Sequence, residues 1–267
     1  MNTSSIPTKP LRAVLMQRLK QRLKPYTPAW LLKYHHDRTI RKDRALYQGK
    51  ALREVFSHVY ETGGWGVAKD HSGFYSGSSS HDPAIVDTYV EAVTAYLGSL
   101  PYRPDVVDLG CGDFNVGSRI RPACARYVAC DVVEAVIQSN RTRFFSSLDV
   151  DFRCLDITSE PWPRGDVVFL RQVLDHLDNA RIAGVLASLT PYKSLILTEY
   201  LPLAPDFPPN LDKPIGPGLR IWGAIPSGIV LTEPPFELKA LSTRILCEVQ
   251  DNVGVIRTIA YELPRQT

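Results

Sequence analysis

The sequence predicts an α/β fold, in which helices cover a doubly wound, seven-stranded and mostly parallel sheet. The apolar run at 106–109 leads directly into glycines at 110 and 112, as expected of a buried strand that ends in a tight turn. Further short apolar segments follow it, interrupted by helical sequence. Near the end, 245–250 and 255–262 flank a turn sequence, which predicts an antiparallel C-terminal hairpin.

Length and composition favour one large core, alone or with an appendage, because the 267 residues are 44% hydrophobic. No apolar run approaches the roughly 20 residues of a membrane span. The first eleven residues lack the apolar stretch of a secretory signal. The five cysteines show no paired spacing, so we expect reduced thiols, no metal site and a cytoplasmic protein.

Basic and acidic residues are distributed unevenly along the chain. Residues 1–53 contain 13 Lys or Arg and two acids, whereas the remainder contains 18 basic and 26 acidic residues. We therefore predict a basic helical extension at 1–60, a lid or substrate loop with a lead-in helix at 61–100, and the catalytic domain at 101–267. Leucines at helical spacing between 11 and 23 indicate an amphipathic helix. It could contact an anionic membrane peripherally, dock on the body or, less readily, bind nucleic acid.

The glycine turn has the form (Asp/Glu)-x-Gly-x-Gly from Asp108 to Gly112. It resembles the first motif of class I S-adenosylmethionine-dependent methyltransferases, and the resemblance extends over about residues 105–262. The dinucleotide fingerprint of dehydrogenases is the rival, but Asn115 stands where its third glycine belongs. The third glycine common in the methyltransferase motif is replaced by Phe114. Asp108 favours the methyltransferase, since the resemblance implies that this acid faces the methionine end of the cofactor.

Two further aspartates complete the predicted cofactor site. Asp131 lies 19 residues beyond Gly112, close to the roughly 20 expected of a carboxylate that binds a ribose. The resemblance implies that Asp156 takes the adenine amino group and that Ile157 lies against the ring. Each aspartate alone could merely cap a turn. The other predicted cofactor contacts are Gly110, Cys111, Val132 and Arg171.

Methyl transfer to a hydroxyl requires a group that accepts the proton. His176 is the first candidate, because it follows the fourth predicted strand and should face the carboxyl edge of the sheet. It could instead only brace the next helix. The alternatives are His71 in the predicted lid and Glu199 at the end of the fifth strand. A metal is not expected, because capping explains the acids around Asp175.

Two loops carry the candidate acceptor contacts. Residues 61–81 are rich in glycine and serine yet hold large aromatic side chains, as in some bacterial methyltransferases that this segment resembles. The proline-rich loop at 202–226 is longer than a simple connection between two strands needs to be, which favours a functional role, and it also contains Trp222. The predicted substrate residues are Trp65, Tyr75, Asp175, Asp212 and Arg220.

The sequence thus predicts an S-adenosylmethionine-dependent enzyme that methylates an oxygen of a small molecule or sugar unit. A nucleic-acid methyltransferase is the first alternative, but Arg171 and Gln172 stand where base-amino enzymes usually have Asn/Asp-Pro-Pro. A nicotinamide-dependent oxidoreductase is disfavoured by Asn115 and by the terminal hairpin. A cofactor-binding protein without catalysis also remains open.

Overall fold

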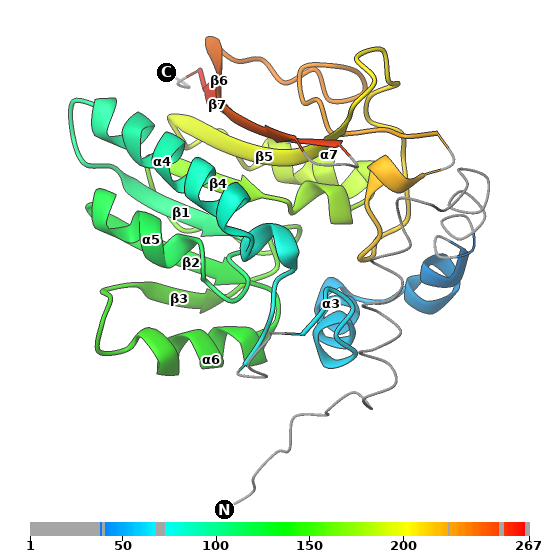
Figure 1. The fold of residues 1–267 in the computed structure, drawn as a ribbon, viewed down its shortest axis with the longest axis horizontal. Helices are drawn as coiled ribbons and strands as arrows, with labels where there is room; N and C mark the ends of the chain where they lie inside the picture. Colours follow the sequence, from blue (N-terminus) through cyan, green and yellow to red (C-terminus); the bar gives the residue numbers. More distant parts are fainter. Residues whose placement is uncertain (1–37, 39–40, 68–72, 224, 251–253, 265–267) are drawn as a thin grey trace, which may run out of the picture.

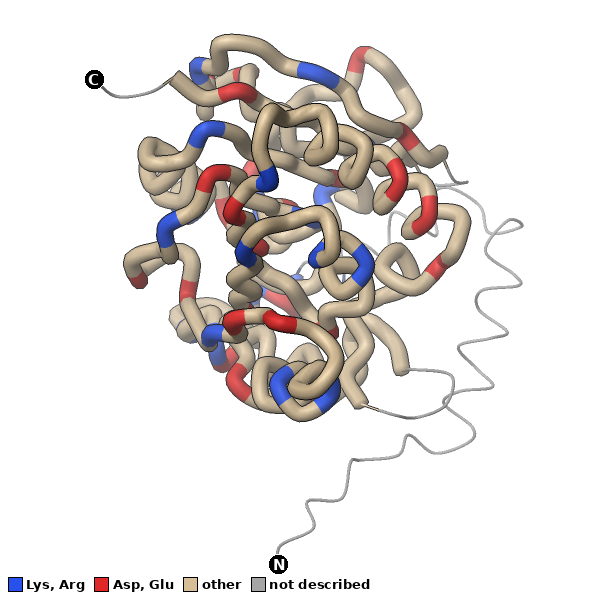
Figure 2. The backbone as a smooth tube through the Cα atoms, turned by 90° about the vertical axis from the view of Figure 1, so that its left-hand side faces the viewer, with Lys and Arg blue, Asp and Glu red and all other residues tan. Residues whose placement is uncertain are grey.

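The computed structural model describes residues 38, 41–67, 73–223, 225–250 and 254–264. Several predictions fall wholly or partly outside these residues. The amphipathic helix at 11–24 with its membrane contact and His71 lie wholly outside, and the loops at 61–81 and 202–226 and the hairpin turn at 251–254 lie partly outside. In the described part, no helix is long and apolar enough to cross a bilayer. Figure 2 shows acidic and basic residues interspersed along that part of the chain.

Seven strands of the described chain form one sheet in the order β3-β2-β1-β4-β5-β7-β6 (Figure 1). The first five are parallel, and β7 runs antiparallel between β5 and β6. This confirms the predicted sheet with its antiparallel C-terminal pair. The bounds are β1 Asp105–Leu109, β2 Arg126–Asp131, β3 Asp151–Cys154, β4 Val167–Arg171, β5 Ser194–Pro202, β6 Ser242–Gln250 and β7 Gly254–Glu262.

Helices cover both faces of the sheet. Successive side chains of each central strand point to opposite faces, so each face has its own apolar core that the helices bury. Val107 and Leu109 of β1 pack on the side of α3 and α7, whereas Val106 packs on the side of α4 and α5. Asp82 caps α4 by accepting a hydrogen bond from the Ala84 amide, as its position before Pro83 predicts. The bounds are α3 Leu52–Glu61, α4 Pro83–Ser99, α5 Gly117–Ile120, α6 Glu134–Phe144 and α7 Asn179–Ala187.

Helix α6 was not predicted from the sequence. Its eleven residues are mostly polar, and its buried side chains are confined to Val136, Ile137 and Asn140. The narrow apolar face gives a weak helical pattern. Asn140 donates from Nδ2 to the carbonyl oxygen of Gly112, so this helix supports the glycine turn directly.

Helix α3 packs into the main core rather than standing apart from it. Leu52, Val55, Phe56 and Val59 are buried on the face of the sheet that α7 also covers. The helix begins at Leu52, after a separate helical segment at 41–47. The predicted N-terminal extension at 1–60 therefore ends within a helix that packs into the core and lines the site described below.

Candidate active site

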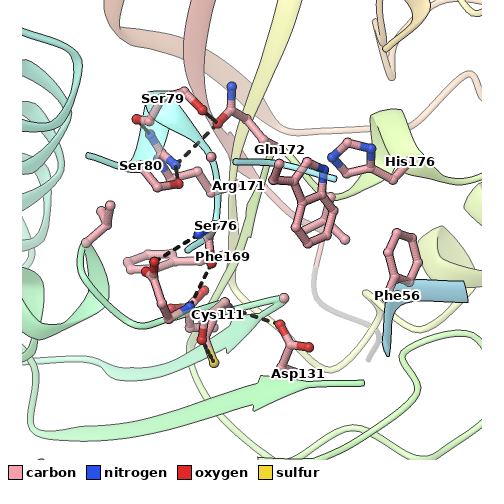
Figure 3. Close-up of a pocket in the computed structure, with 18 of the residues that line it drawn as sticks. Phe56, Ser76, Ser79, Ser80, Cys111, Asp131, Phe169, Arg171, Gln172 and His176 are labelled. Atoms are coloured by element: carbon pink, nitrogen blue, oxygen red, sulfur yellow. Dashed lines mark hydrogen bonds between the residues drawn. The ribbon is translucent and has the colours of Figure 1, made fainter. Parts of the chain in front are cut away.

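A cavity of about 450 Å³ lies at the carboxyl ends of β1, β2 and β4 (Figure 3). The strand order runs outward in opposite directions from β1, to β2 on one side and to β4 on the other. Ligands of doubly wound folds bind at such a point, because the connections leave the sheet on opposite faces and open a crevice between them. The cavity is lined by α3, the glycine turn, the ends of these strands and the loop between β5 and β6.

The glycine turn needs both of its glycines. Gly110 has φ 81° and Gly112 has φ 55°, a region that side chains disfavour. A Cβ added to Gly110 would overlap Val173, and one added to Gly112 would overlap the Ser76 hydroxyl. Phe114 keeps the left-handed conformation, with φ 59°, although a side chain replaces the third glycine. Its fully buried ring packs against three other aromatic rings, which offsets the backbone strain.

The three predicted aspartates all line this cavity. Asp108 accepts a hydrogen bond from Tyr127 Oη at 2.9 Å, and burial raises its pKa to about 7. Asp131 accepts from the amides of Gly112 and Val133, each at 3.0 Å, and burial raises its pKa to about 6. Asp156 lies beyond the end of β3, where its Oδ1 accepts from Thr158.

Residues 73–80, here called the roof loop, are fastened over the glycine turn by Asp113. The Ser76 amide donates to Asp113 Oδ2 at 2.9 Å, and the Asp113 amide donates to Ser76 Oγ at 2.8 Å. His81 Nε2 lies 2.6 Å from the same Oδ2. Asp113 was not among the predicted site residues, because its partner Ser76 lies 37 positions away in the sequence.

The other end of the roof loop is fastened to the end of β4 (Figure 3). Arg171 donates from Nη2 to the Ser79 carbonyl at 2.7 Å and from Nη1 to Ser80 Oγ at 3.0 Å. Its guanidinium lies 5.0 Å from the centre of the Tyr89 ring, and burial lowers its pKa. Within the described chain its Nε is buried without a hydrogen-bond partner, and no carboxylate forms an ion pair with it.

His176 lines the cavity on the side of α3 (Figure 3). Its ring lies 5.5 Å from that of Trp65 and 6.2 Å from that of Phe56. Nδ1 lies 3.2 Å from the Gly216 carbonyl, which can only accept, so Nδ1 carries the proton and Nε2 keeps its lone pair. Burial lowers the His176 pKa to about 3, and the ring is therefore neutral.

Glu199 is not among the cavity residues. Its Oε1 accepts from the Leu174 amide at 2.9 Å, and burial raises its pKa well above the ordinary value. A buried carboxyl that does not line the cavity does not meet the need for a base that contacts the acceptor.

Trp65 is the one predicted substrate residue that lines the cavity. Tyr75 instead stacks on His81, with ring centres 4.4 Å apart. Asp175 and Arg220 form a fully buried ion pair at 3.3 Å, and Arg220 also donates to the Leu177 carbonyl. Asp212 accepts from the amide of Asn179 at the start of α7. These charges hold the long loop in place, because their partners are structural groups.

Among the described residues of the long loop, those that line the cavity are Pro217, Leu219 and Trp222. The sequence marks Trp222 by its place in this loop, whereas nothing in the sequence pattern marks the other two.

Residues 107–192 match a family model described as a methyltransferase domain. The fold is similar to that of the N-methyltransferase NodS from Bradyrhizobium japonicum WM9 in complex with S-adenosyl-L-homocysteine. That likeness has a TM-score of 0.53 at 13% identity and covers 69% of this chain and 90% of that one. A S-adenosylmethionine-dependent methyltransferase from Leishmania major gives a TM-score of 0.51 at 12% identity, over 79% of both chains. No curated protein sequence matches significantly.

The solved structures share the fold, and the family match falls on the segment that holds the glycine turn, Asp131, Asp156 and the end of β4. Residues 107–192 thus match a methyltransferase domain, and the chain shares the fold of solved S-adenosylmethionine-dependent methyltransferases.

Proposed function

We propose that the protein is a class I S-adenosylmethionine-dependent methyltransferase and that it transfers the methyl group of this cofactor to a hydroxyl of a small molecule, with a sugar unit as the alternative acceptor. The observation that carries this proposal is the roofed cavity, which joins a cofactor cradle to a side-chain-lined space at the ends of β4 and β5. Such a space suits a compact acceptor that can be enclosed.

The nucleoside part of the cofactor fits the half of the cavity around Asp131. Each of its carboxylate oxygens accepts one backbone amide and retains a lone pair for a ribose hydroxyl. Apolar side chains at the ends of β2 and β3 can hold the adenine ring: Val132, Leu155 and Ile157.

The amino-acid tail of the cofactor fits between Asp108 and Arg171. These groups line the same cavity with opposite charges, but they do not form an ion pair with each other. A buried charge without an ionic partner is costly. A zwitterionic tail would offer its ammonium group to Asp108 and its carboxylate to Arg171, and it would thereby compensate both.

The bound cofactor supplies an electrophilic methyl group, and the chain aligns the acceptor with it. The roof loop excludes water, and a fixed in-line geometry lowers much of the barrier. We assign His176 to orientation, with Nε2 accepting the hydrogen bond of the acceptor hydroxyl. As the O–CH3 bond forms and the S–CH3 bond breaks, the hydroxyl becomes strongly acidic, and Nε2 takes its proton. A pKa of about 3 makes His176 a weak base before that point, so alignment is its larger contribution.

Calorimetry with S-adenosylhomocysteine and with NAD tests the cofactor half of the proposal. We expect saturable binding of S-adenosylhomocysteine and none of NAD. Methyl transfer from labelled cofactor to a panel of phenols, sugars and oligonucleotides tests the acceptor class. Labelling of oligonucleotides alone would overturn the proposal.

A further inference from the structure

Two walls of the cavity differ in their chemistry. The carboxylates that line it lie at the glycine turn and beyond the ends of β2 and β3: Asp108, Asp113, Asp131 and Asp156. Across β4, the lining comes from α4, β5 and the loop before β6. We call these residues the apolar wall: Ile85, Tyr89, Tyr200, Leu219 and Trp222. Among the described residues, no acid lines the cavity at this wall.

The apolar wall is a packed structure assembled from distant segments. Tyr200 is buried together with Ile221 and Ile256, and Ile85, Leu219 and Trp222 pack against this cluster. Gly254 permits the packing, since a Cβ at that position would overlap Ile221 and the Leu201 carbonyl. The wall therefore has a fixed shape rather than the freedom of a surface loop.

Arg220 holds the short helical turn Arg220–Trp222 in place from behind. Its amide donates to Asp175 at 3.0 Å, and its guanidinium donates to the carbonyls of Leu174, Leu177 and Leu211. The guanidinium of Arg220 is thus bound by groups of the protein itself, whereas its neighbours Leu219 and Trp222 line the cavity. Arg220 is a positioning residue for the wall.

We propose that the apolar wall is the acceptor subsite and that it takes a flat, uncharged ring, such as a phenol. The inference rests on the proposed function and narrows its acceptor. Aromatic and aliphatic side chains gain free energy by covering a ring. A saccharide carries many hydroxyls, and each one buried here without a partner would cost binding free energy.

The test uses 2-naphthol as the probe, titrated into the full chain saturated with S-adenosylhomocysteine. We expect one saturable site, and we expect Trp222→Ala to weaken binding at least fivefold while the affinity for S-adenosylhomocysteine stays unchanged. Phe145→Ala is the matched control, because that ring is 89% exposed at the end of α6 and does not line the cavity. It should leave the binding of both ligands unchanged.

Non-saturable binding of 2-naphthol, equal binding by Trp222→Ala, or tighter binding of methyl glucoside than of 2-naphthol would each overturn the inference. Leu219→Ala provides a second variant should Trp222→Ala unfold, and unchanged affinity for S-adenosylhomocysteine reports that the cofactor half is intact. Failure of S-adenosylhomocysteine itself to bind the wild-type chain would instead overturn the proposed function.

Discussion

The two halves of the cavity are built in opposite ways. The cofactor half consists of backbone amides and short acidic side chains around a turn that tolerates no Cβ at Gly110 or Gly112. The acceptor half consists of bulky side chains brought together from α4, β5 and a long loop. The difference indicates that separate contacts hold the two halves. A substitution in one half should therefore weaken the binding of its own ligand and leave binding in the other half intact.

Arg220→Met should have the largest effect and tests that independence directly. Removing one member of a buried ion pair leaves Asp175 unpaired, so we expect the free energy of unfolding to fall by about 3–5 kcal/mol. Denaturant titration measures the loss. At a temperature where the variant is folded, 2-naphthol binding should disappear and S-adenosylhomocysteine binding should persist. Equal loss of both ligands would contradict the separation of the two halves.

Gly112→Ala should disturb the cofactor half of the cavity. The new methyl group would meet the Ser76 hydroxyl at a left-handed backbone position, so we expect S-adenosylhomocysteine to bind about 100-fold more weakly, or about 3 kcal/mol. Calorimetry measures the change. The double variant with Ser76→Gly removes the overlapping atom and should recover part of the affinity. No recovery would show that the clash with the roof loop is not the cause.

Asp131→Ala should weaken S-adenosylhomocysteine by about 1.5–3 kcal/mol, the size of a charged hydrogen bond. 5′-Methylthioadenosine contains the ribose but no amino-acid tail, and its binding should weaken by the same factor. Asp149→Ala, at an exposed carboxylate outside the cavity, is the control. An unchanged affinity of Asp131→Ala would refute the ribose assignment.

The pH dependence of binding should show the smallest effect. Asp108 has a pKa of about 7 and must be ionised to attract an ammonium group. Affinity for S-adenosylhomocysteine should therefore rise about tenfold from about pH 6 to about pH 8. Asp131, with a pKa of about 6, adds a change of the same sign at the lower end.

Asp108→Asn isolates the contribution of Asp108 to this profile. The variant should flatten the rise, and its affinity for 5′-methylthioadenosine should match the wild type. A profile as steep as that of the wild type would contradict the role of Asp108 in holding the tail.

The cofactor half was predictable from sequence, because its parts are local. The glycine turn, Asp131 and Asp156 each end a short apolar segment, and parallel strands bring their carboxyl ends to one edge. Their roles toward the cofactor remain predictions. The acceptor half was not predictable in the same way. Asp175 and Arg220 are neighbours only in the folded chain, 45 residues apart, and a charge in a long loop gives no sign of whether its partner is a ligand or the protein.

Two smaller differences between the predicted and the observed structure also have physical reasons. Helix α6 has too narrow an apolar face to stand out, and Glu199 ends no strand, because β5 continues to Pro202. Within the longer strand, the Glu199 carboxyl is buried and accepts a hydrogen bond from the Leu174 amide, and it does not line the cavity.

The double fastening of the roof loop has a kinetic consequence. Hydrogen bonds tie it both to Asp113 beside the glycine turn and to Arg171 at the end of β4. We expect S-adenosylhomocysteine, the product bound beneath the roof loop, to leave only after these hydrogen bonds break together. Methyl transfer itself takes place while they are formed. Product departure should then limit steady-state turnover, and the first catalytic cycle should appear as a burst.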